Sequence, residues 1–146
     1  MATRFACGQT VTVRRRMSAR LIRMFGELVG DSGGLHLSDV DGRPAAHGLY
    51  LAAVANTLGP GVDVLGRRLT LEILAPAYAA DVVEATTTVT DVRPAGAFGD
   101  WIEADVVYRN QHGQLLARGS YTGFARHHPH TTDEAPRPTS RESGST

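Results

Sequence analysis

Residues 47–60 read His-Gly-Leu-Tyr-Leu-Ala-Ala-Val-Ala-Asn-Thr-Leu-Gly-Pro. This stretch is apolar on nearly every face, which is typical of a helix that is buried on all sides. The Gly59-Pro60 pair ends it, because proline cannot continue a helix. Asn56 is its one strongly polar interior residue, and a buried amide needs hydrogen-bond partners. The stretch predicts one long buried helix that begins at His47.

The sequence after this helix has the patterns of β-strands. Residues 69–73 alternate apolar and polar side chains, and residues 82–92 are rich in threonine and valine, which favour strands. Residues 101–108 and 115–125 complete a set of four strands. A turn at residues 111–113 joins the last two as a hairpin. Because short turns connect successive strands, we expect an antiparallel sheet.

The sequence before the central helix predicts a strand and a shorter helix. Residues 9–15 alternate threonine and valine and predict the strand. Ser18 is a good N-cap for the helix, and Gly30 stands where a left-handed cap residue belongs. The spacing i, i+3, i+4, i+7 and i+8 predicts an apolar helix face made of Leu21, Met24, Phe25, Leu28 and Val29.

These elements predict an α+β fold in which a curved antiparallel sheet wraps around the long central helix. A single domain is expected over residues 1–126, because the length of 146 residues suits one hydrophobic core. From residue 127 onward the composition changes to proline, threonine, serine, glutamate and arginine. Residues 127–146 are therefore predicted to form a disordered polar tail.

The location of the protein is constrained by what its sequence lacks. No run of about 18 apolar residues is present, so we expect no membrane span. The start of the chain has no apolar signal core. The single cysteine, Cys7, excludes an intrachain disulfide and fits a reducing compartment. We therefore expect a cytoplasmic protein that does not bind a membrane.

Residues 30–36 read Gly-Asp-Ser-Gly-Gly-Leu-His and place a carboxylate, Asp31, five residues before an imidazole, His36. Asp31 follows a helix C-terminus, where the helix dipole opposes negative charge, so function explains this placement better than stability does. Taken alone, Asp31 also fits a turn-forming aspartate, and His36 fits an ordinary loop histidine. It is their spacing, next to the start of the buried helix, that indicates an acid–base pair.

Two short motifs carry a resemblance to a known family. The first is Gly30-Asp31-Ser-Gly-Gly-Leu-His36, and the second is Ala46-His47-Gly48-Leu49 at the start of the predicted central helix. Over about residues 9–126, the chain resembles the hotdog fold and specifically the MaoC-like, (R)-specific enoyl-thioester hydratases and dehydratases. It departs from the family at Gly33-Gly34, where Asn-Pro is usual, and in the short stretch from His36 to His47.

The resemblance implies reversible addition of water to the double bond of an enoyl thioester, without a metal or another cofactor. Asp31 and His36 are then the catalytic residues and share the two proton transfers. The backbone N–H of Gly48 is the expected donor to the thioester oxyanion. Asn56, eight positions further on, corresponds to a polar residue of the family's site, and His47 is expected to anchor the loop by hydrogen bonds.

Other functions and partners stay open at this point. The hotdog fold also supports thioesterases, and a non-catalytic subunit that binds acyl chains is a third interpretation. A homodimer is expected, because a single hotdog sheet has an unpaired edge.

The expected substrate is carried on CoA or on an acyl-carrier protein. Six arginines and no acidic residue precede Glu27, which suits phosphates or an acidic carrier face but equally an ordinary solvated surface. These arginines are Arg4, Arg14, Arg15, Arg16, Arg20 and Arg23. Nucleic acid is not expected to bind, because no aromatic side chains are interleaved with them for stacking.

Overall fold

The computed structural model describes residues 5–37 and 42–127. In chain order its elements are β1 (Thr10–Arg16), α1 (Ala19–Val29), α2 (Gly34–Leu37), α3 (Gly48–Ala53), β2 (Val62–Ile73), β3 (Val82–Pro94), the 3-10 turn η1 (Gly96–Phe98), β4 (Asp100–Arg109) and β5 (Leu115–His127). No helix within the described ranges is both long and apolar enough to cross a bilayer.

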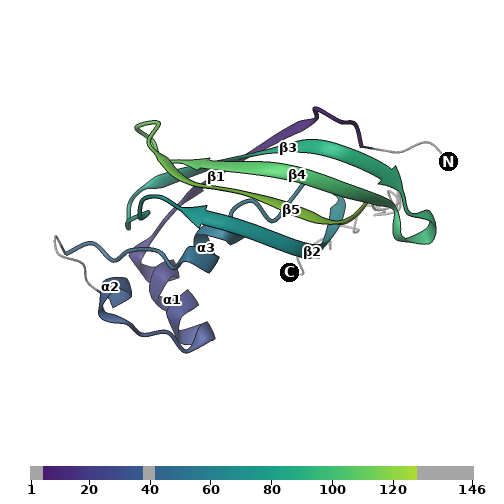
Figure 1. Cartoon of the computed structure of the whole chain (residues 1–146). Helices are drawn as coiled ribbons and strands as arrows, with labels where there is room; N and C mark the ends of the chain where they lie inside the picture. Colours follow the sequence, from purple (N-terminus) through teal and green to yellow (C-terminus); the bar gives the residue numbers. More distant parts are fainter. Residues whose placement is uncertain (1–4, 38–41, 128–146) are drawn as a thin grey trace, which may run out of the picture.

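The five strands form one curved antiparallel sheet in the order β1-β3-β4-β5-β2 (Figure 1). All of the predicted strands are present, and β4 and β5 pair as the predicted hairpin. The strand β2 follows α3 in the chain but pairs only with β5, at the far edge of the sheet. The predicted α+β architecture is therefore confirmed.

The inner face of the sheet forms the hydrophobic core. Alternate residues of β3, β4 and β5 are buried, as the two-residue period of a strand requires. These side chains pack against α3, the residues that follow it, and Ile22 of α1. Figure 1 shows α3 beneath the concave side of the sheet, with α1 and α2 beyond one end of it. The helix α3 thus lies under the sheet, whereas α1 and α2 lie at one end of it (Figure 1).

The central helix α3 is much shorter than predicted, because it ends at Ala53. From Val54 to Asn56, the backbone N–H groups bond three residues back instead of four. The Tyr108 hydroxyl donates to the carbonyl of Ala52 at 3.1 Å, and the same carbonyl accepts the Ala55 N–H at 3.3 Å. Val54 and Ala55 stay buried although they lie outside the helix. The apolar pattern therefore marked a buried segment whose second half is a turn.

The ends of α1 were predicted correctly, but its buried face was not. The Ser18 hydroxyl accepts the Leu21 N–H at 3.1 Å, and Gly30 adopts a left-handed conformation with φ of 75°. The buried residues of α1 are Ile22 and Gly26. The predicted apolar face is largely exposed, at Leu21, Met24, Leu28 and Val29. At Gly26, the Asp31 carbonyl and the His47 ring lie against α1, so this side of the helix is the covered one.

The segment between Asp31 and Pro44 contains the short helix α2. Residues 38–41 lie outside the described ranges, and so does the predicted tail at residues 128–146. The tail therefore stays a prediction. His127, the first residue of that predicted tail, is the last residue of β5 and stacks on Phe5 with ring centroids 4.7 Å apart.

Candidate active site

Three side chains from separate elements meet beside the end of α1. They are Asp31 from the turn after α1, His36 from α2, and His47 at the N-cap of α3. Asp31 Oδ2 lies 3.6 Å from His36 Nε2 and 3.7 Å from His47 Nε2. The Asp31 side chain is 53% exposed, whereas His36 and His47 are 20% and 5% exposed. The cluster is open to solvent at its carboxylate and closed at its second histidine.

The turn that carries Asp31 and His36 is held by its own backbone. Asp31 Oδ1 accepts the Gly33 N–H at 3.1 Å, and the His36 N–H bonds the Gly33 carbonyl at 2.9 Å. These bonds give the Gly33-Gly34 turn a defined geometry in place of the stiffness that proline would supply. The glycine pair therefore keeps the acid and the imidazole within reach of each other.

The protonation pattern of His36 follows from its partner at Nδ1. That nitrogen lies 2.7 Å from the carbonyl oxygen of Ala45, which can only accept a hydrogen bond. Nδ1 is therefore the N–H of the neutral ring, and Nε2 carries the lone pair on the side of Asp31. This tautomer leaves Nε2 free to take a proton or, when the ring is charged, to give one back.

His47 is the buried support of the cluster. Its ring stacks on His36 with centroids 3.5 Å apart and an interplanar angle of 18°, and it packs against Phe25 at 5.2 Å. Its Nε2 lies 3.3 Å from the backbone carbonyl of Asp31, whereas its Nδ1 is buried without a partner. The contact of Nε2 with the Asp31 carbonyl lets His47 hold the Asp31 turn in place.

Gly26 is a site residue that the sequence interpretation missed. A Cβ atom added there would lie 2.5 Å from the Asp31 carbonyl oxygen and 3.2 Å from His47 Cε1. The Gly26 carbonyl also accepts the Asp31 N–H at 2.9 Å. Only a residue without a side chain lets His47 and the Asp31 turn lie against α1. A glycine in the middle of a helix is itself a signal of close approach, since it weakens the helix.

Gly48 begins α3 beside the cluster, as the second motif predicted. The first N–H groups of a helix have no partner within the helix. His47, the N-cap residue, makes no side-chain capping bond to them, because its ring is turned toward Asp31. Ile73 of β2 covers the Cα of Gly48, since an added Cβ would lie 2.5 Å from Ile73 Cδ1. The helix start is thus left uncapped beneath an apolar side chain.

His36 lies between two cavities of different size. One has a volume of about 40 Å³ and is lined by residues that include Gly26, Asp31, His36 and His47. This volume suits a single water molecule, whose share of liquid volume is about 30 Å³. The other has a volume of about 330 Å³, and its lining includes His36, Gly48, Leu51, Ile73 and Pro76. The second cavity is large enough for part of an organic substrate.

Asn56 does not join this cluster. It is exposed rather than buried, which corrects the expectation of an interior amide with hydrogen-bond partners. It lines a third cavity, near the end of α3, instead of the two that His36 borders. The early end of α3 turns this side chain away from the core. Of the predicted site residues, Asp31, His36, His47 and Gly48 are therefore brought together, and Asn56 is not.

The donor atoms of Asp31, His36 and His47 lie within 4.8 Å of one another, which raises the question of a metal ion. An imidazole binds a metal along the in-plane lone pair of its nitrogen. The planes of the stacked His36 and His47 rings are nearly parallel, with centroids 3.5 Å apart, so one ion cannot lie in the plane of both rings. The arrangement therefore suits proton transfer and does not fit metal coordination by both histidines.

Comparisons with known proteins place this geometry in context. No protein-family model matches the chain. It is 32% identical over 97 residues to a 3-hydroxybutyryl-CoA dehydratase of Methylorubrum extorquens, a match that covers 60% of this chain. The chain spans 62% of the length of that curated relative.

Solved structures match over a larger part of the chain. The R-hydratase PhaJ1 of Pseudomonas aeruginosa superposes with a TM-score of 0.70 at 20% identity, covering 85% of this chain and 84% of its own. A MaoC-like dehydratase of Rhodospirillum rubrum superposes with a TM-score of 0.68 at 22% identity, covering 86% of this chain and 95% of its own. The resemblance that the two motifs indicated is confirmed, and the chain has the hotdog fold of the R-hydratases and MaoC-like dehydratases.

Proposed function

We propose that the protein is a hydro-lyase that interconverts an enoyl thioester and its 3-hydroxyacyl thioester. The observation that carries this proposal is the position of His36 between the water-sized cavity beside Asp31 and the larger cavity beside Gly48. Such an arrangement brings water to one side of an acid–base pair and an acyl group to the other. The similarity to a 3-hydroxybutyryl-CoA dehydratase supports the same reaction.

In the hydration direction, water occupies the small cavity and loses a proton to the Asp31 carboxylate as its oxygen bonds to C3 of the thioester. The electron pair of the double bond moves toward the carbonyl, whose oxygen becomes negative. The Gly48 N–H donates to this oxygen at the uncapped start of α3. Protonated His36 then delivers its Nε2 proton to C2. Each proton transfer contributes about 10²–10⁴-fold to the rate.

The two catalytic groups return to their starting states by exchanging one proton. After hydration, Asp31 is protonated and His36 is neutral, with the lone pair of Nε2 facing Asp31 Oδ2 across 3.6 Å. A small movement, or one water molecule, lets the proton pass from the carboxyl group to the ring. In the dehydration direction, His36 removes the C2 proton, and Asp31 protonates the departing hydroxyl group.

Incubation with crotonyl-CoA is expected to yield 3-hydroxybutyryl-CoA, detected by mass spectrometry as the addition of one water with the thioester intact. The same product is expected to lose water when supplied as substrate, because the reaction is reversible. Longer enoyl-CoAs are measured in parallel to determine the preferred chain length. Enoyl thioesters of an acyl-carrier protein are measured to determine whether the substrate is carried on CoA or on the carrier protein.

Two results would contradict the proposal. Release of free CoA without a hydrated product would identify a thioesterase. No change in any CoA or carrier-protein thioester would leave a non-catalytic subunit that binds acyl chains. A control with heat-denatured protein accounts for the spontaneous hydration and hydrolysis of the thioesters.

We further propose that two copies of the chain associate through β2. This strand is twelve residues long, pairs only with β5, and exposes the apolar side chains of Leu65, Leu69 and Ile73. An unpaired edge of this length invites another strand. The opposite edge, β1, carries Arg14, Arg15 and Arg16, and these like charges oppose its pairing with a second copy.

Light scattering is expected to give twice the mass of one chain. The Leu65→Lys variant is expected to shift the protein toward the monomer, because it places a charge on the β2 edge of each copy. Thr12→Lys, on β1, is the matched control and is expected to leave the mass unchanged. A monomeric wild-type protein, or equal effects of the two variants, would contradict association through β2.

A further inference from the structure

The side chain of Ile73, the last residue of β2, lies against the start of α3. A Cβ atom added to Gly48 would lie 2.5 Å from Ile73 Cδ1 and 3.9 Å from Ile73 Cγ1. Beyond the residues next to Gly48 and the backbone of α3, no other atom of the described chain comes within 4 Å of that position. The longer distance is ordinary van der Waals contact, whereas the shorter one is an overlap. One methyl group, Cδ1 of Ile73, therefore fills the space beside Gly48.

Ile73 is also close to any group that accepts the Gly48 N–H. The nitrogen of Gly48 and an added Cβ are both bonded to the same Cα and lie about 2.5 Å apart, so Ile73 Cδ1 is within about 5 Å of this nitrogen. A carbonyl oxygen that accepts the N–H lies about 2.9 Å from the nitrogen. A thioester held at Gly48 therefore shares the space beside the helix start with the Ile73 methyl group.

The cavity that contains both residues can distinguish substrates by size. Its volume is about 330 Å³, and apart from His36 none of the described residues that line it has a polar side chain. Leu51 and Ala77 in its wall are each 2% exposed, and packed side chains of this kind yield little. Contacts beside Gly48 are therefore apolar, and the room that they leave is limited by Ile73.

The proposed reaction brings C2 of the substrate to this place. C2 is bonded to the carbonyl carbon, whose oxygen accepts the Gly48 N–H, and it takes its proton from His36, which lines the same cavity. A substituent on C2 is therefore the branch of the acyl group that lies nearest to Gly48 and Ile73. A hydrogen atom on C2 needs no additional space, whereas a methyl group needs the space that Cδ1 fills.

We propose that Ile73 makes the protein selective for enoyl thioesters that carry only hydrogen at C2. The inference rests on the proposed function, because it takes the thioester carbonyl to be held at Gly48 and C2 to face His36. It adds the substrate class: an acyl group that is unbranched at C2, as in crotonyl-CoA, and not one that is branched there, as in 2-methylcrotonyl-CoA.

The Ile73→Val variant tests this selectivity, because valine lacks the Cδ1 atom and keeps the branched Cβ that suits a strand. The measured quantity is kcat/KM for crotonyl-CoA divided by kcat/KM for 2-methylcrotonyl-CoA. This ratio is expected to fall by about 10–200-fold in Ile73→Val, which is the usual effect of one methylene group in an apolar pocket. The intrinsic difference in reactivity between the two substrates cancels, since each protein is measured with both.

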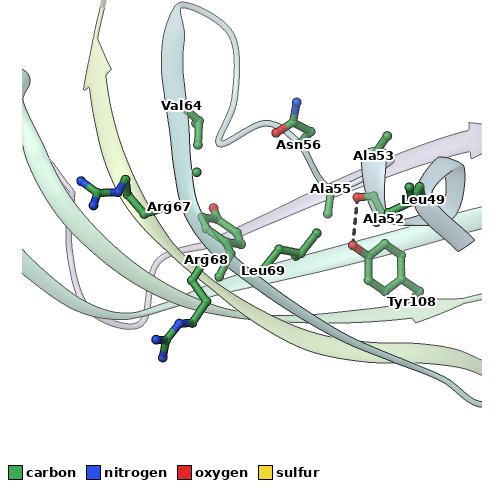
Figure 2. Close-up of a pocket in the computed structure, with 12 residues that line it drawn as sticks. Leu49, Ala52, Ala53, Ala55, Asn56, Val64, Arg67, Arg68, Leu69 and Tyr108 are labelled. Atoms are coloured by element: carbon green, nitrogen blue, oxygen red, sulfur yellow. Dashed lines mark hydrogen bonds between the residues drawn. The ribbon is translucent and has the colours of Figure 1, made fainter. Parts of the chain in front are cut away.

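Leu69→Val is the matched control. Leu69 and Ile73 lie four residues apart on one face of β2, with no bulge between them, and are 51% and 50% exposed. Leu69 borders a different cavity, at the end of α3 (Figure 2). The control includes any effect of a smaller apolar side chain on β2, and it is expected to keep the wild-type ratio. An unchanged ratio in Ile73→Val, or an equal fall in Leu69→Val, would overturn the inference.

A binding experiment separates this inference from the proposed activity. Calorimetry with propionyl-CoA and with isobutyryl-CoA, which has one more methyl group at C2, needs no turnover. The wild-type protein is expected to bind propionyl-CoA about tenfold more tightly, and Ile73→Val is expected to bind the two about equally. Equal affinities in the wild-type protein, or a difference that persists in Ile73→Val, would overturn the inference even if crotonyl-CoA is hydrated. If neither compound binds, the thioester site at Gly48 is overturned as well.

Discussion

Replacing Asp31 by asparagine is expected to lower the rate of enoyl-CoA hydration by about 10²–10⁴-fold while leaving the fold intact. Asparagine retains an Oδ1 atom that can accept the Gly33 N–H, as Asp31 does at 3.1 Å. It cannot take a proton from water. Its amide would instead donate to the His36 Nε2 lone pair, so the ring could not pick up the proton that it must deliver to C2. The rate is measured with crotonyl-CoA, and folding is checked by thermal unfolding.

His36→Ala tests whether the two residues act as one unit. Each single variant removes one of two coupled proton transfers, so the double variant is expected to be about as slow as the slower single variant. Asp105→Asn is the matched control, since Asp105 is an exposed carboxylate on β4 that lines neither of the cavities beside His36. Wild-type rates in both Asp31→Asn and His36→Ala would show that the catalytic residues lie elsewhere.

The parts of this structure that depend on local sequence could be predicted. Ser18 caps α1 with its own hydroxyl group, and Gly30 ends the helix in a left-handed conformation, so both signals act within a few residues. The strands were readable because their inner faces are buried in strict alternation. The spacing of Asp31 and His36 was also informative, since α2 folds that short segment back on itself.

The parts that depend on distant contacts could not be predicted. At the end of α3, the Ala52 carbonyl accepts a hydrogen bond from the Tyr108 hydroxyl, and these two residues are 56 positions apart. That early end exposes Asn56, which an apolar helix would have buried. The buried face of α1 depends in the same way on His47, which packs against Gly26 from the start of another helix. The spacing of apolar residues shows that a helix has an apolar face, but which face is buried depends on the elements that pack against the helix.

The Gly26→Ala variant is expected to lose both stability and activity. The added methyl group would lie 2.5 Å from the Asp31 carbonyl oxygen and 3.3 Å from His47 Nε2, so the Asp31 turn or the His47 ring must move. Overpacking of this kind costs about 1–3 kcal/mol, which exceeds the 0.5–1 kcal/mol that alanine gains over glycine within a helix. A displacement of about 1 Å at the catalytic pair lowers the rate by roughly 10²-fold.

Gly34→Ala provides the matched control for this effect. Gly34 also lies in a helix, but a Cβ added there meets nothing within 4 Å. Chemical denaturation is therefore expected to show equal or slightly higher stability for Gly34→Ala and a clear loss for Gly26→Ala. If Gly26→Ala were as stable and as active as the wild-type protein, the close packing of His47 and the Asp31 turn against α1 would not be what positions the acid–base pair. A loss confined to Gly26→Ala would instead identify a helix residue with no side chain as a determinant of the catalytic geometry.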